Sequence, residues 1–324
     1  MSSETKAGVV LVIAQGEDAT ADLVVETLRA RGAEVARIDT ADFPRRLSLA
    51  AAPDRLDSPG YLYTEHHLID LAAVRSVYRR SPARFAFPDG MSGPEERFAT
   101  LESVCGLGGV LAAQPWRWID HPSAVADASY KPRQLQVAVQ RGLTVPRSLV
   151  TNIGARVRAF AAEVGGAIVY KSLATGVVAE EDELRLVYTS RLTADELDDT
   201  AIALSCHLFQ EWVPKAFDVR LTVVGERCFA VAIRTEHSEA VIDWRQRYDA
   251  LRYEVIDTPA EVRPGVLGYL REFGLTFGAF DFSVTPDGSW WFLECNPAGQ
   301  WGWIAEETGL PIADAIADEL LREA

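Results

Sequence analysis

The segment from residue 278 to 301, GAFDFSVTPDGSWWFLECNPAGQW, limits the possible folds of this chain more than any other segment. Two apolar, aromatic-rich runs flank a Pro-Asp-Gly-Ser turn, which is typical of a β-hairpin. If Pro286–Ser289 forms the loop, counting back along both strands places Asp281 directly opposite Glu294.

The two faces of this predicted hairpin differ in chemistry. Because side chains alternate along a strand, Asn296 shares the acidic face of Glu294, and Cys295 points to the other face. That other face is entirely apolar, so we expect it to lie in the core. Its expected cross-strand pairs are Phe280 with Cys295, Phe282 with Leu293, and Val284 with Trp291.

Facing carboxylates repel each other, because their Cβ atoms lie about 5 Å apart across a sheet. A cation between Asp281 and Glu294 would remove this repulsion. Oxygen ligands with no His or Cys nearby favour a hard ion such as Mg²⁺, which often keeps phosphate oxygens among its ligands. The hairpin therefore predicts a magnesium and nucleotide site. The alternative is a solvated acidic face that binds nothing.

The beginning of the chain has the pattern of a parallel α/β domain. Val9–Ala14 is a continuous apolar run, as in a strand buried on both faces. The amphipathic stretch Ala19–Arg31 ends at Gly32, and Glu34–Ile38 is the next expected strand. Strand, helix and strand at this spacing predict a parallel unit.

Further elements are expected along the rest of the chain. The segment WRWIDHP, residues 116–122, is interpreted as a boundary, and the region after Ile168 as rich in hairpins, one of them turning at residues 225–227. The expected strands are Ala72–Tyr78, Val145–Val150, Ala167–Tyr170 and Leu208–Val213, and the expected helices are Pro94–Gly108, Ser123–Arg141, Val157–Val164 and Leu310–Glu323.

Composition argues against several classes of protein. The net charge of −15 disfavours general nucleic-acid binding, which needs clustered Lys and Arg. No apolar run approaches the roughly 20 residues of a membrane helix, and the first residues lack the pattern of a secretion signal. The four cysteines lie far apart without CxxC spacing, which favours reduced thiols in a cytoplasmic protein.

Asp281, Glu294 and Asn296 resemble, in type and spacing, the metal-binding signature of the ATP-grasp enzymes. This resemblance implies that Asp281 and Glu294 bind one Mg²⁺, and that Glu294 and Asn296 help to bind a second. Lys131 and Lys171 lie where the family has its two phosphate-contacting lysines. The motifs follow the family's order across residues 125–300.

FQEWV, residues 209–213, resembles the adenine-binding hinge of the same family, with Glu211 and the backbone of Val213 as contacts. Asp218 occupies the position of a ribose-binding acid. ATP and Mg²⁺ are therefore the implied cofactors. Two features depart from the family: the phosphate-covering segment SLATG after Lys171 is poor in glycine, and the first domain matches only in its α/β pattern.

A narrower group is indicated by NPAGQWGWIAEETGLPIADAIADEL, residues 296–320. It resembles the C-terminus of the ATP-grasp maturases of graspetides, the microviridin-type peptides with ω-ester or ω-amide cross-links. YRRSP at residues 78–82 and DWR at residues 243–245 resemble the same group. Simple packing of the last helix is the alternative explanation for Trp301 and Trp303.

This narrower resemblance implies an ATP-dependent macrocyclisation of a ribosomal precursor peptide with a leader and a core. Asp or Glu side chains of the core would be activated as acyl phosphates and attacked by Ser or Thr, giving an ester, or by Lys, giving an amide. A homodimer is compatible with this expectation.

The implied fold class is α/β and α+β, an ATP-grasp fold with an N-terminal parallel α/β pre-ATP-grasp domain. Residues 1–118 would form that domain. Residues 119–205 would form the central ATP-grasp subdomain, and residues 206–324 the C-terminal subdomain that carries the metal site.

Positive charge is needed in addition to the two lysines, because phosphoryl transfer and the tetrahedral intermediate after it both develop negative charge. Arg220 and Arg245 are the candidates for holding the γ-phosphoryl oxygens or the peptide carboxylate, with Arg234 behind them. No general base is assigned, because the five histidines are scattered. SLATG and neighbouring loops are expected to close as a lid against water.

Four consecutive acids, Glu180, Glu181, Asp182 and Glu183, resemble the tip of a hairpin near which related maturases bind their leader peptide. We predict that they bind a basic residue of such a leader. The alternative is a solvated turn, which charge alone favours.

Two other functions stay open at the level of sequence. An ATP-grasp ligase that attaches a free amino acid to a peptide or small molecule would have the same ATP and metal residues. A non-catalytic nucleotide-binding or scaffold protein would be expected to lose metal ligands, yet all three are present.

Overall fold

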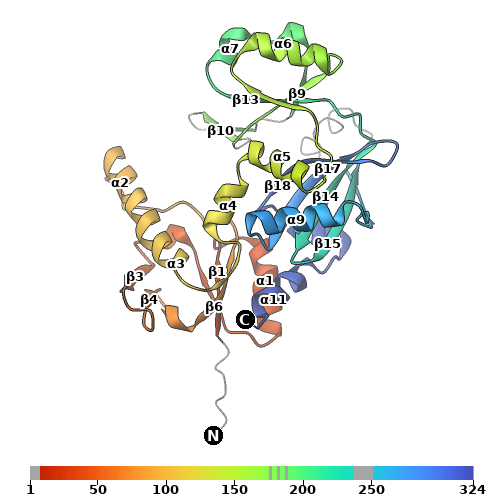
Figure 1. The fold of residues 1–324 in the computed structure, drawn as a ribbon. Helices are drawn as coiled ribbons and strands as arrows, with labels where there is room; N and C mark the ends of the chain where they lie inside the picture. The colour runs from red at the N-terminus through yellow and green to blue at the C-terminus, as the bar shows by residue number, and fades with distance from the viewer. Residues whose placement is uncertain (1–7, 175–176, 181–182, 187–188, 236–250, 324) are drawn as a thin grey trace. The chain divides into compact units, whose positions relative to one another are not determined.

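The structure is a computed structural model, and it describes residues 8–323 apart from 175–176, 181–182, 187–188 and 236–250 (Figure 1). The chain divides into two compact units. Unit 1 comprises residues 1–125, 275–277 and 300–324, and unit 2 comprises residues 126–274 and 278–299. A division into two units does not decide where three subdomains begin, so the boundaries at residues 118 and 205 stay a prediction.

Unit 1 is built on a four-stranded parallel sheet with the strand order β2-β1-β6-β7, of which β1 and β6 are labelled in Figure 1. All five residues of β1 are buried, as expected for an inner strand of a covered parallel sheet. The parallel unit predicted from the first residues is therefore confirmed. The strands are β1 (Val9–Ile13), β2 (Val35–Ile38), β6 (Val74–Arg79) and β7 (Arg117–Ile119).

Helices from both ends of the chain pack together in unit 1. Helix α1 (Ala19–Ala30) contacts α10 (Gly302–Thr308) and α11 (Ile312–Leu321). Asp18 caps α1 by accepting the Ala21 N–H at 3.0 Å. After α1 the chain turns at Gly32, whose φ of 77° favours glycine. None of the helices in the described part of the chain has the length and apolar character to span a bilayer.

Two parts of unit 1 differ from the sequence prediction. The segment interpreted as a boundary contains strand β7, and a small antiparallel sheet with order β3-β4-β5 had no predicted counterpart. Its strands have only three or four residues, so their alternation is too short to recognise. The remaining elements are β3 (Ser48–Ala51), β4 (Gly60–Tyr63), β5 (Leu68–Asp70), η1 (Thr40–Asp42), η2 (Leu71–Ala73), α2 (Gly93–Ser103), η3 (Val104–Gly108) and α3 (Gly109–Ala112).

The first sheet of unit 2 has the strand order β12-β9-β13-β8. Helix α6 (Gly154–Glu163) covers one face, where Val157 and Phe160 pack against Ile168 and Phe209. The strands are β8 (Ser148–Thr151), β9 (Ile168–Lys171), β12 (Ser190–Leu192) and β13 (His207–Glu211), and nearby lie the hairpin β10 (Val177–Glu180) with β11 (Glu183–Leu186), η4 (Ala194–Glu196) and α7 (Asp199–Ala203).

The second sheet of unit 2 has the strand order β16-β15-β14-β17-β18. The hairpin predicted at residues 225–227 joins β14 to β15, where Val224 pairs with Arg227. Helix α9 (Arg263–Phe273) packs against this sheet, and the Tyr269 ring lies 5.2 Å from that of Phe280. The strands are β14 (Phe217–Val224), β15 (Arg227–Arg234), β16 (Arg252–Ile256), β17 (Phe277–Val284) and β18 (Trp290–Asn296).

The helix predicted from Ser123 to Arg141 is interrupted. The structure has α4 (Pro122–Ala128) and α5 (Lys131–Gln140), and Tyr130 between them is extended, with φ −78° and ψ 102°. Pro132 explains the break, because proline donates no backbone hydrogen bond and would clash with the carbonyl four residues earlier in a continuous helix. The break makes Lys131 the first residue of α5.

Candidate active site

The hairpin of β17 and β18 brings Asp281 directly opposite Glu294, as predicted, and also pairs Phe280 with Cys295. Nearer the turn, the apolar face is buried, as predicted, but its cross-strand pairs differ from the predicted ones. Those predictions are wrong: the pairs there are Phe282 with Phe292 and Val284 with Trp290.

The hairpin departs from the predicted register in two places, and the two shifts cancel at the pair of Asp281 and Glu294. The loop is shorter than expected, because the Thr285 N–H donates to the Ser289 carbonyl at 3.0 Å. A register shift directly after Asp281 then leaves Leu293 as an extra residue, in a β-bulge. Leu293 lines a pocket instead of facing the core. The bulge restores the predicted register at the two carboxylates.

Each of the two carboxylates has its own cation. Asp281 accepts from Arg220 Nη1 at 2.9 Å, and Glu294 Oε2 lies 2.8 Å from Lys131 Nζ. These cations explain how the sheet accommodates facing acids in this structure. Gly299 leaves the space for Arg220, because a Cβ at that position would lie 2.8 Å from Arg220 Nη2.

Gln134 fixes the strand that carries Glu294, and the sequence analysis did not identify it. Its Oε1 accepts the Cys295 N–H at 3.0 Å, and its Nε2 donates to the carbonyls of Cys295 at 2.8 Å and Ala128 at 2.6 Å. Gln134 is 3% exposed and follows Lys131 by one turn of α5. It therefore attaches the helix of one charged partner to the strand of the other.

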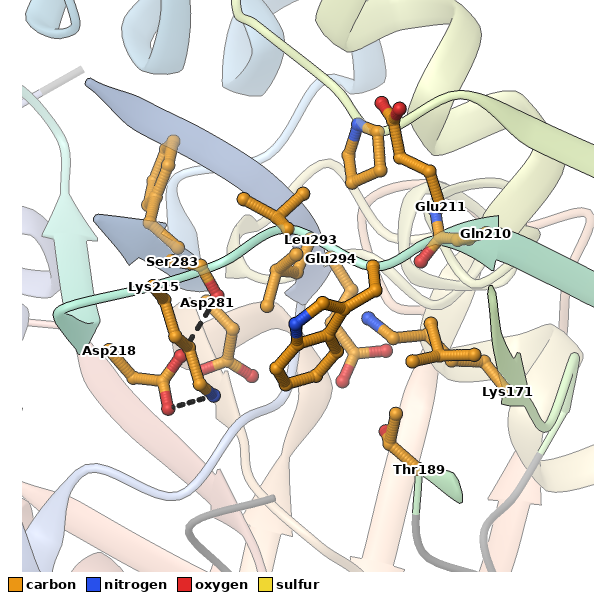
Figure 2. Close-up of a pocket in the computed structure, with 15 residues that line it drawn as sticks. Lys171, Thr189, Gln210, Glu211, Lys215, Asp218, Asp281, Ser283, Leu293 and Glu294 are labelled. Atoms are coloured by element: carbon orange, nitrogen blue, oxygen red, sulfur yellow. Dashed lines mark hydrogen bonds and ion pairs between the residues drawn. The ribbon is translucent and has the colours of Figure 1, made fainter. Parts of the chain in front are cut away.

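Both sheets of unit 2 contribute to one pocket (Figure 2). Asp281 and Glu294 line it from the second sheet, and Lys171, at the end of β9, lines it from the first. Gln210 on β13 also lines it and pairs with Val169 on β9. Since alternate residues of these strands face the α6 core, the sheet presents a polar face to the pocket.

The chain segment after β13 also borders the pocket. Glu211 Oε1 accepts the Arg147 N–H at 2.8 Å, so the Glu211 carboxylate already has a partner. The Trp212 N–H donates to the Ala167 carbonyl at 3.1 Å. The Val213 N–H donates to no backbone carbonyl among the described residues. This segment can therefore offer a backbone donor to a ligand.

Asp218 lies in the pocket wall as part of a buried acid–base pair. It bonds Lys215, and it accepts from Ser283 Oγ at 3.0 Å. Burial raises the pKa of the Asp218 carboxyl, and the neighbouring Lys215 opposes that shift. Lys215 was not predicted; it lies four residues after the glutamate of the QEWV motif.

Some predicted site residues are not in the pocket lining. Asn296 follows Glu294 on β18 but is exposed, and its Oδ1 accepts the Ala298 N–H at 3.0 Å. Arg234 is exposed as well: it pairs with Glu254 at 2.9 Å, and its guanidinium lies over the Phe217 ring. Arg245 and the DWR motif lie outside the described residues.

The four predicted peptide-binding acids are described only in part. Glu180 ends β10 and pairs through the backbone with Glu183, which begins β11. Glu181 and Asp182 lie outside the described residues. Glu180 and Glu183 therefore flank the turn of a hairpin, and the peptide-binding role of the four acids stays a prediction.

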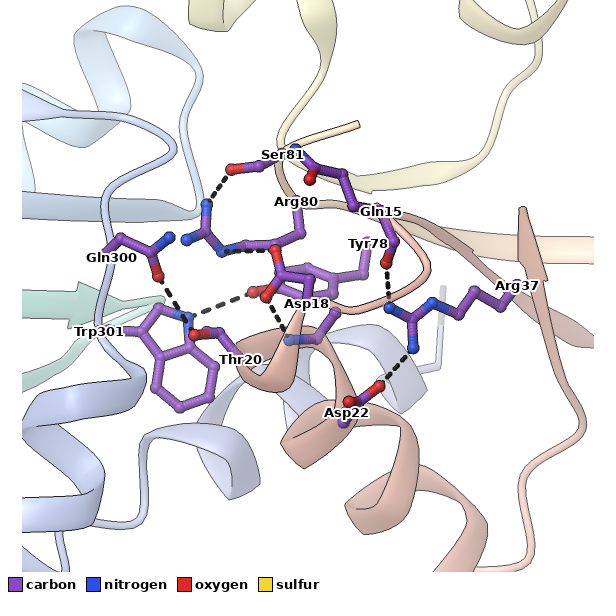
Figure 3. Close-up of polar contacts among 11 residues, drawn as sticks. Gln15, Asp18, Thr20, Asp22, Arg37, Tyr78, Arg80, Ser81, Gln300 and Trp301 are labelled. Carbon is purple, nitrogen blue, oxygen red and sulfur yellow. Dashed lines mark hydrogen bonds and ion pairs between the residues drawn. The ribbon is translucent and has the colours of Figure 1, made fainter. Parts of the chain in front are cut away.

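The YRRSP and GQWGW motifs meet in unit 1 (Figure 3). Trp301 is fully buried and donates from Nε1 to the Tyr78 hydroxyl at 3.2 Å. Burial raises the pKa of Tyr78 to about 12. Thr20 Oγ1 donates to Gln300 Oε1 at 3.2 Å, and Arg80 Nε lies 3.9 Å from Asp18 Oδ2. Trp301 therefore packs inside unit 1 and links the two motifs.

Asp120 is a second acid of unit 1 whose partners lie far along the chain. Its two carboxylate oxygens accept the N–H groups of Thr276 at 2.7 Å and Phe277 at 3.0 Å, where β17 begins. Burial raises the pKa of Asp120 to about 7, and these two hydrogen bonds reduce the shift. Asp120 therefore holds the start of the strand that carries Asp281.

The donor set at the hairpin fits Mg²⁺ shared with a phosphate ligand. Among the residues that the structure describes, no three His, Cys, Asp or Glu side chains gather closely enough to hold a metal ion by themselves. Asp281 and Glu294 provide carboxylate oxygens on one face, and Asn296 follows on the same strand. Mg²⁺ commonly binds one or two carboxylates together with substrate phosphates.

Comparison with known proteins agrees with this geometry. Residues 9–126 match the family model of the MvdD pre-ATP grasp domain. The macrocyclase MdnC of Microcystis aeruginosa MRC, solved with the precursor peptide MdnA, is 30% identical with a TM-score of 0.86, and the match covers 98% of this chain and 100% of MdnC. No curated protein matches the sequence significantly.

Two further solved structures extend the comparison over almost the whole chain. The macrocyclase MdnB of the same organism is 30% identical with a TM-score of 0.82, covering 98% of this chain and 100% of MdnB. The ATP-grasp ligase PsnB, solved with a phosphomimetic variant of a minimal precursor, Mg and ADP, is 27% identical with a TM-score of 0.77. That match covers 96% of this chain and 98% of PsnB.

Proposed function

Because this chain belongs to the graspetide-type ATP-grasp ligases, the family of the macrocyclases MdnC and MdnB, we propose that it uses ATP and Mg²⁺ to macrocyclise a ribosomally made precursor peptide. One observation carries the proposal. The facing pair Asp281 and Glu294 lies in a pocket that also contains Lys171 and the hinge segment before Val213.

The substrate follows from the chemistry of the family's relatives. MdnC was solved with a precursor peptide, and PsnB with a precursor, Mg and ADP. ATP transfers its γ-phosphoryl group to an Asp or Glu carboxylate of the core peptide, giving an acyl phosphate and ADP. A Ser, Thr or Lys side chain of the same peptide then attacks the acyl carbon, and phosphate leaves. The peptide loses one water for each ring formed.

Asp281, Glu294 and Asn296 would hold Mg²⁺, which would neutralise charge on the β- and γ-phosphates. Lys131 and Lys171 bind the phosphates as compact positive charges. Lys131 leaves Glu294 when it does so. The exposure of both side chains, 20% each, leaves room for that exchange.

Other residues position the nucleotide and the reacting carboxylate. The backbone of Val213 donates to the adenine, the backbone of Glu211 accepts from it, and Asp218 accepts from the ribose hydroxyls. Arg220, bonded to Asp281, stabilises charge that develops on the γ-phosphoryl group. Arg245 grips the peptide carboxylate. Arg234, on the strand next to that of Arg220, has a supporting role.

The leader peptide docks at the β10–β11 hairpin. Glu180, Glu181, Asp182 and Glu183 attract a basic residue of the leader through several weak, salt-sensitive pairs. The backbone pairing of Glu180 with Glu183 supports this location, because it brings these two residues together across one hairpin turn.

The test combines purified enzyme, MgATP and a candidate precursor encoded beside its gene. We expect ADP and phosphate in equal amounts, and a peptide mass lower by one water per cross-link. Mild alkaline hydrolysis restores the mass of an ester ring but not that of an amide. AMP and pyrophosphate, or a mass increase that matches an added amino acid, would reject the proposal.

A further inference from the structure

Gln210 combines burial with an unused hydrogen-bond acceptor in the nucleotide pocket. It is 1% exposed and lines the pocket from β13. Its Oε1 has no hydrogen-bond partner among the described residues. Burying a carbonyl oxygen without a donor costs free energy, so such an atom in a pocket indicates a ligand that supplies the donor.

The hydrogen-bond network fixes which end of the amide faces the pocket. Ser148 Oγ lies 2.8 Å from the Pro146 carbonyl, and since a carbonyl only accepts, the serine must use its proton there. The serine oxygen can then only accept from Gln210, whose Nε2 lies 2.9 Å away. Nε2 is thereby held at Ser148, and Oε1 remains as the acceptor.

Sheet geometry explains why Gln210 points to this side. Gln210 pairs with Ser148 on β8 and with Val169 on β9, and cross-strand partners share a face. Its neighbour Phe209 points to the opposite face, into the α6 core. Gln210 therefore lies on the pocket side of the sheet, as Lys171 does. The hinge residues that follow it can contact the base only from the segment after β13.

We propose that Gln210, with its amide oriented by Ser148, selects adenine over 6-oxopurines by accepting a hydrogen bond from the 6-amino group. This inference rests on the proposed nucleotide site. Adenine carries a donor at position 6, whereas hypoxanthine and guanine carry a carbonyl there. A 6-oxo group would place two acceptors opposite each other with no proton between them, which an enclosed site rejects.

The experiment compares ATP, ITP and purine riboside triphosphate, which lacks the 6-substituent, as substrates for phosphate release with the peptide. For the wild-type enzyme, kcat/KM should fall about tenfold without the 6-amino group and about 100-fold or more with ITP. Gln210→Met keeps the volume but removes the acceptor. It should lower the preference for ATP over purine riboside triphosphate about threefold or more, leaving the part that the backbone of Glu211 supplies.

A second variant tests the orientation without changing Gln210. Ser148→Ala removes the acceptor for Nε2, so the amide can rotate and offer a donor to a 6-oxo group. The preference for ATP over ITP should fall about tenfold, mainly through better use of ITP. The matched control, Ser148→Thr, keeps the hydroxyl and should keep the wild-type preference.

The outcomes separate this inference from the proposed function. Calorimetric binding of MgATP that is weakened by Lys171→Met supports the pocket itself, and its absence would overturn both. If MgATP binding depends on Lys171 but Gln210→Met and Ser148→Ala keep the wild-type base preference, only the role of Gln210 is rejected.

Discussion

The two units hold their acidic side chains in different ways. In unit 1, Asp18 accepts a backbone N–H of α1, and its neighbour Arg80 is 3% exposed. In unit 2, Asp281 and Glu294 pair with side-chain cations, and their side chains are 16% and 20% exposed. Asp18 in unit 1 is thus bound to the backbone, whereas Asp281 and Glu294 in unit 2 are bound to side chains that can move.

This difference teaches which ion pairs can take part in ligand binding. A carboxylate that caps a helix cannot leave without exposing backbone donors. The Glu294–Lys131 pair can open toward water, because a lysine is a flexible point charge on a long stem. The Asp281–Arg220 pair lies between these extremes, since the Arg220 side chain is only 7% exposed.

The largest expected effect is on activity in unit 2. Glu294→Gln and Asp281→Asn should each lower peptide-dependent ADP formation about 10²–10³-fold, because each removes a carboxylate that is proposed to hold Mg²⁺. Glu226→Gln, in the exposed β14–β15 turn, is the matched control and should retain wild-type turnover. Near-normal turnover of either site variant would contradict the metal assignment.

Thermal unfolding of the same variants sharpens the comparison within unit 2. Asp281→Asn removes the charge of Asp281 from beside the buried Arg220 cation, at a cost of about 1–3 kcal/mol. Glu294→Gln should cost less, because Lys131 can reach water. Equal losses in the two variants would contradict the distinction between a fixed and an exchangeable pair.

In unit 1, the contribution of Asp120 to stability can be measured through its dependence on pH. Burial raises the pKa of Asp120 in the folded chain from its ordinary value of 3.8 to about 7, so the folded chain binds the proton more tightly than the unfolded chain does. Its contribution to stability is therefore fully present below about pH 4 and is lost as the pH rises to about 7. The wild type should gain up to about 4 kcal/mol relative to Asp120→Asn between pH 7 and pH 4. Denaturant unfolding of both proteins at several pH values measures this, and parallel curves would reject it.

In unit 2, the neutral side chain of Gln134 bonds to backbone groups, as the acids Asp18 and Asp120 do in unit 1. Gln134→Leu leaves the N–H of Cys295 and the carbonyls of Ala128 and Cys295 without their partner, which should cost about 1–3 kcal/mol. Turnover should fall as well, because Lys131 and Glu294 lose their common attachment. Gln136→Leu, on the exposed side of α5, serves as the control in chemical denaturation and activity assays. A variant that loses stability but keeps the wild-type KM for ATP would make Gln134 a purely structural residue.

The smallest effect is expected at the surface of unit 1. Arg31 forms ion pairs with Asp314 and Asp318, whose side chains are about half exposed. Arg31→Gln should cost about 0.2–1 kcal/mol, and the loss should shrink in high salt. Arg29→Gln in the same helix is the control. A larger loss that is independent of salt would show that the contact of α1 with α11 depends on this arginine for packing.

The sequence was sufficient to predict the features of the fold that depend on residues close to each other in the chain. Alternation along β17 and β18 was enough to place Asp281 opposite Glu294, and the apolar run at Val9 was enough to predict the inner strand of unit 1. The bulge at Leu293 was not predictable, because it depends on a loop whose length is decided by one hydrogen bond. A small change in a turn moves every pair beyond it.

Contacts between residues far apart in the chain also could not be predicted from the sequence. The partners of Asp120 lie 156 and 157 residues away, and Cys295 lies 161 residues from Gln134. Nothing in the local pattern of either residue indicates such a partner. Lys131 and Lys171 were predicted only because their order resembled a family. The raised pKa of Asp120 and the amide orientation of Gln210 could be found only from the coordinates.

The composition of unit 1 from both early and late residues affects how the protein is made. Its first 125 residues leave the ribosome long before residues 300–324 are translated. Until then, the face of α1 that contacts α11 is uncovered, and Tyr78 lacks Trp301. Unit 1 therefore cannot finish folding until residues 300–324 have been translated. A messenger that is cut short before residue 300 therefore yields no chain with a finished unit 1.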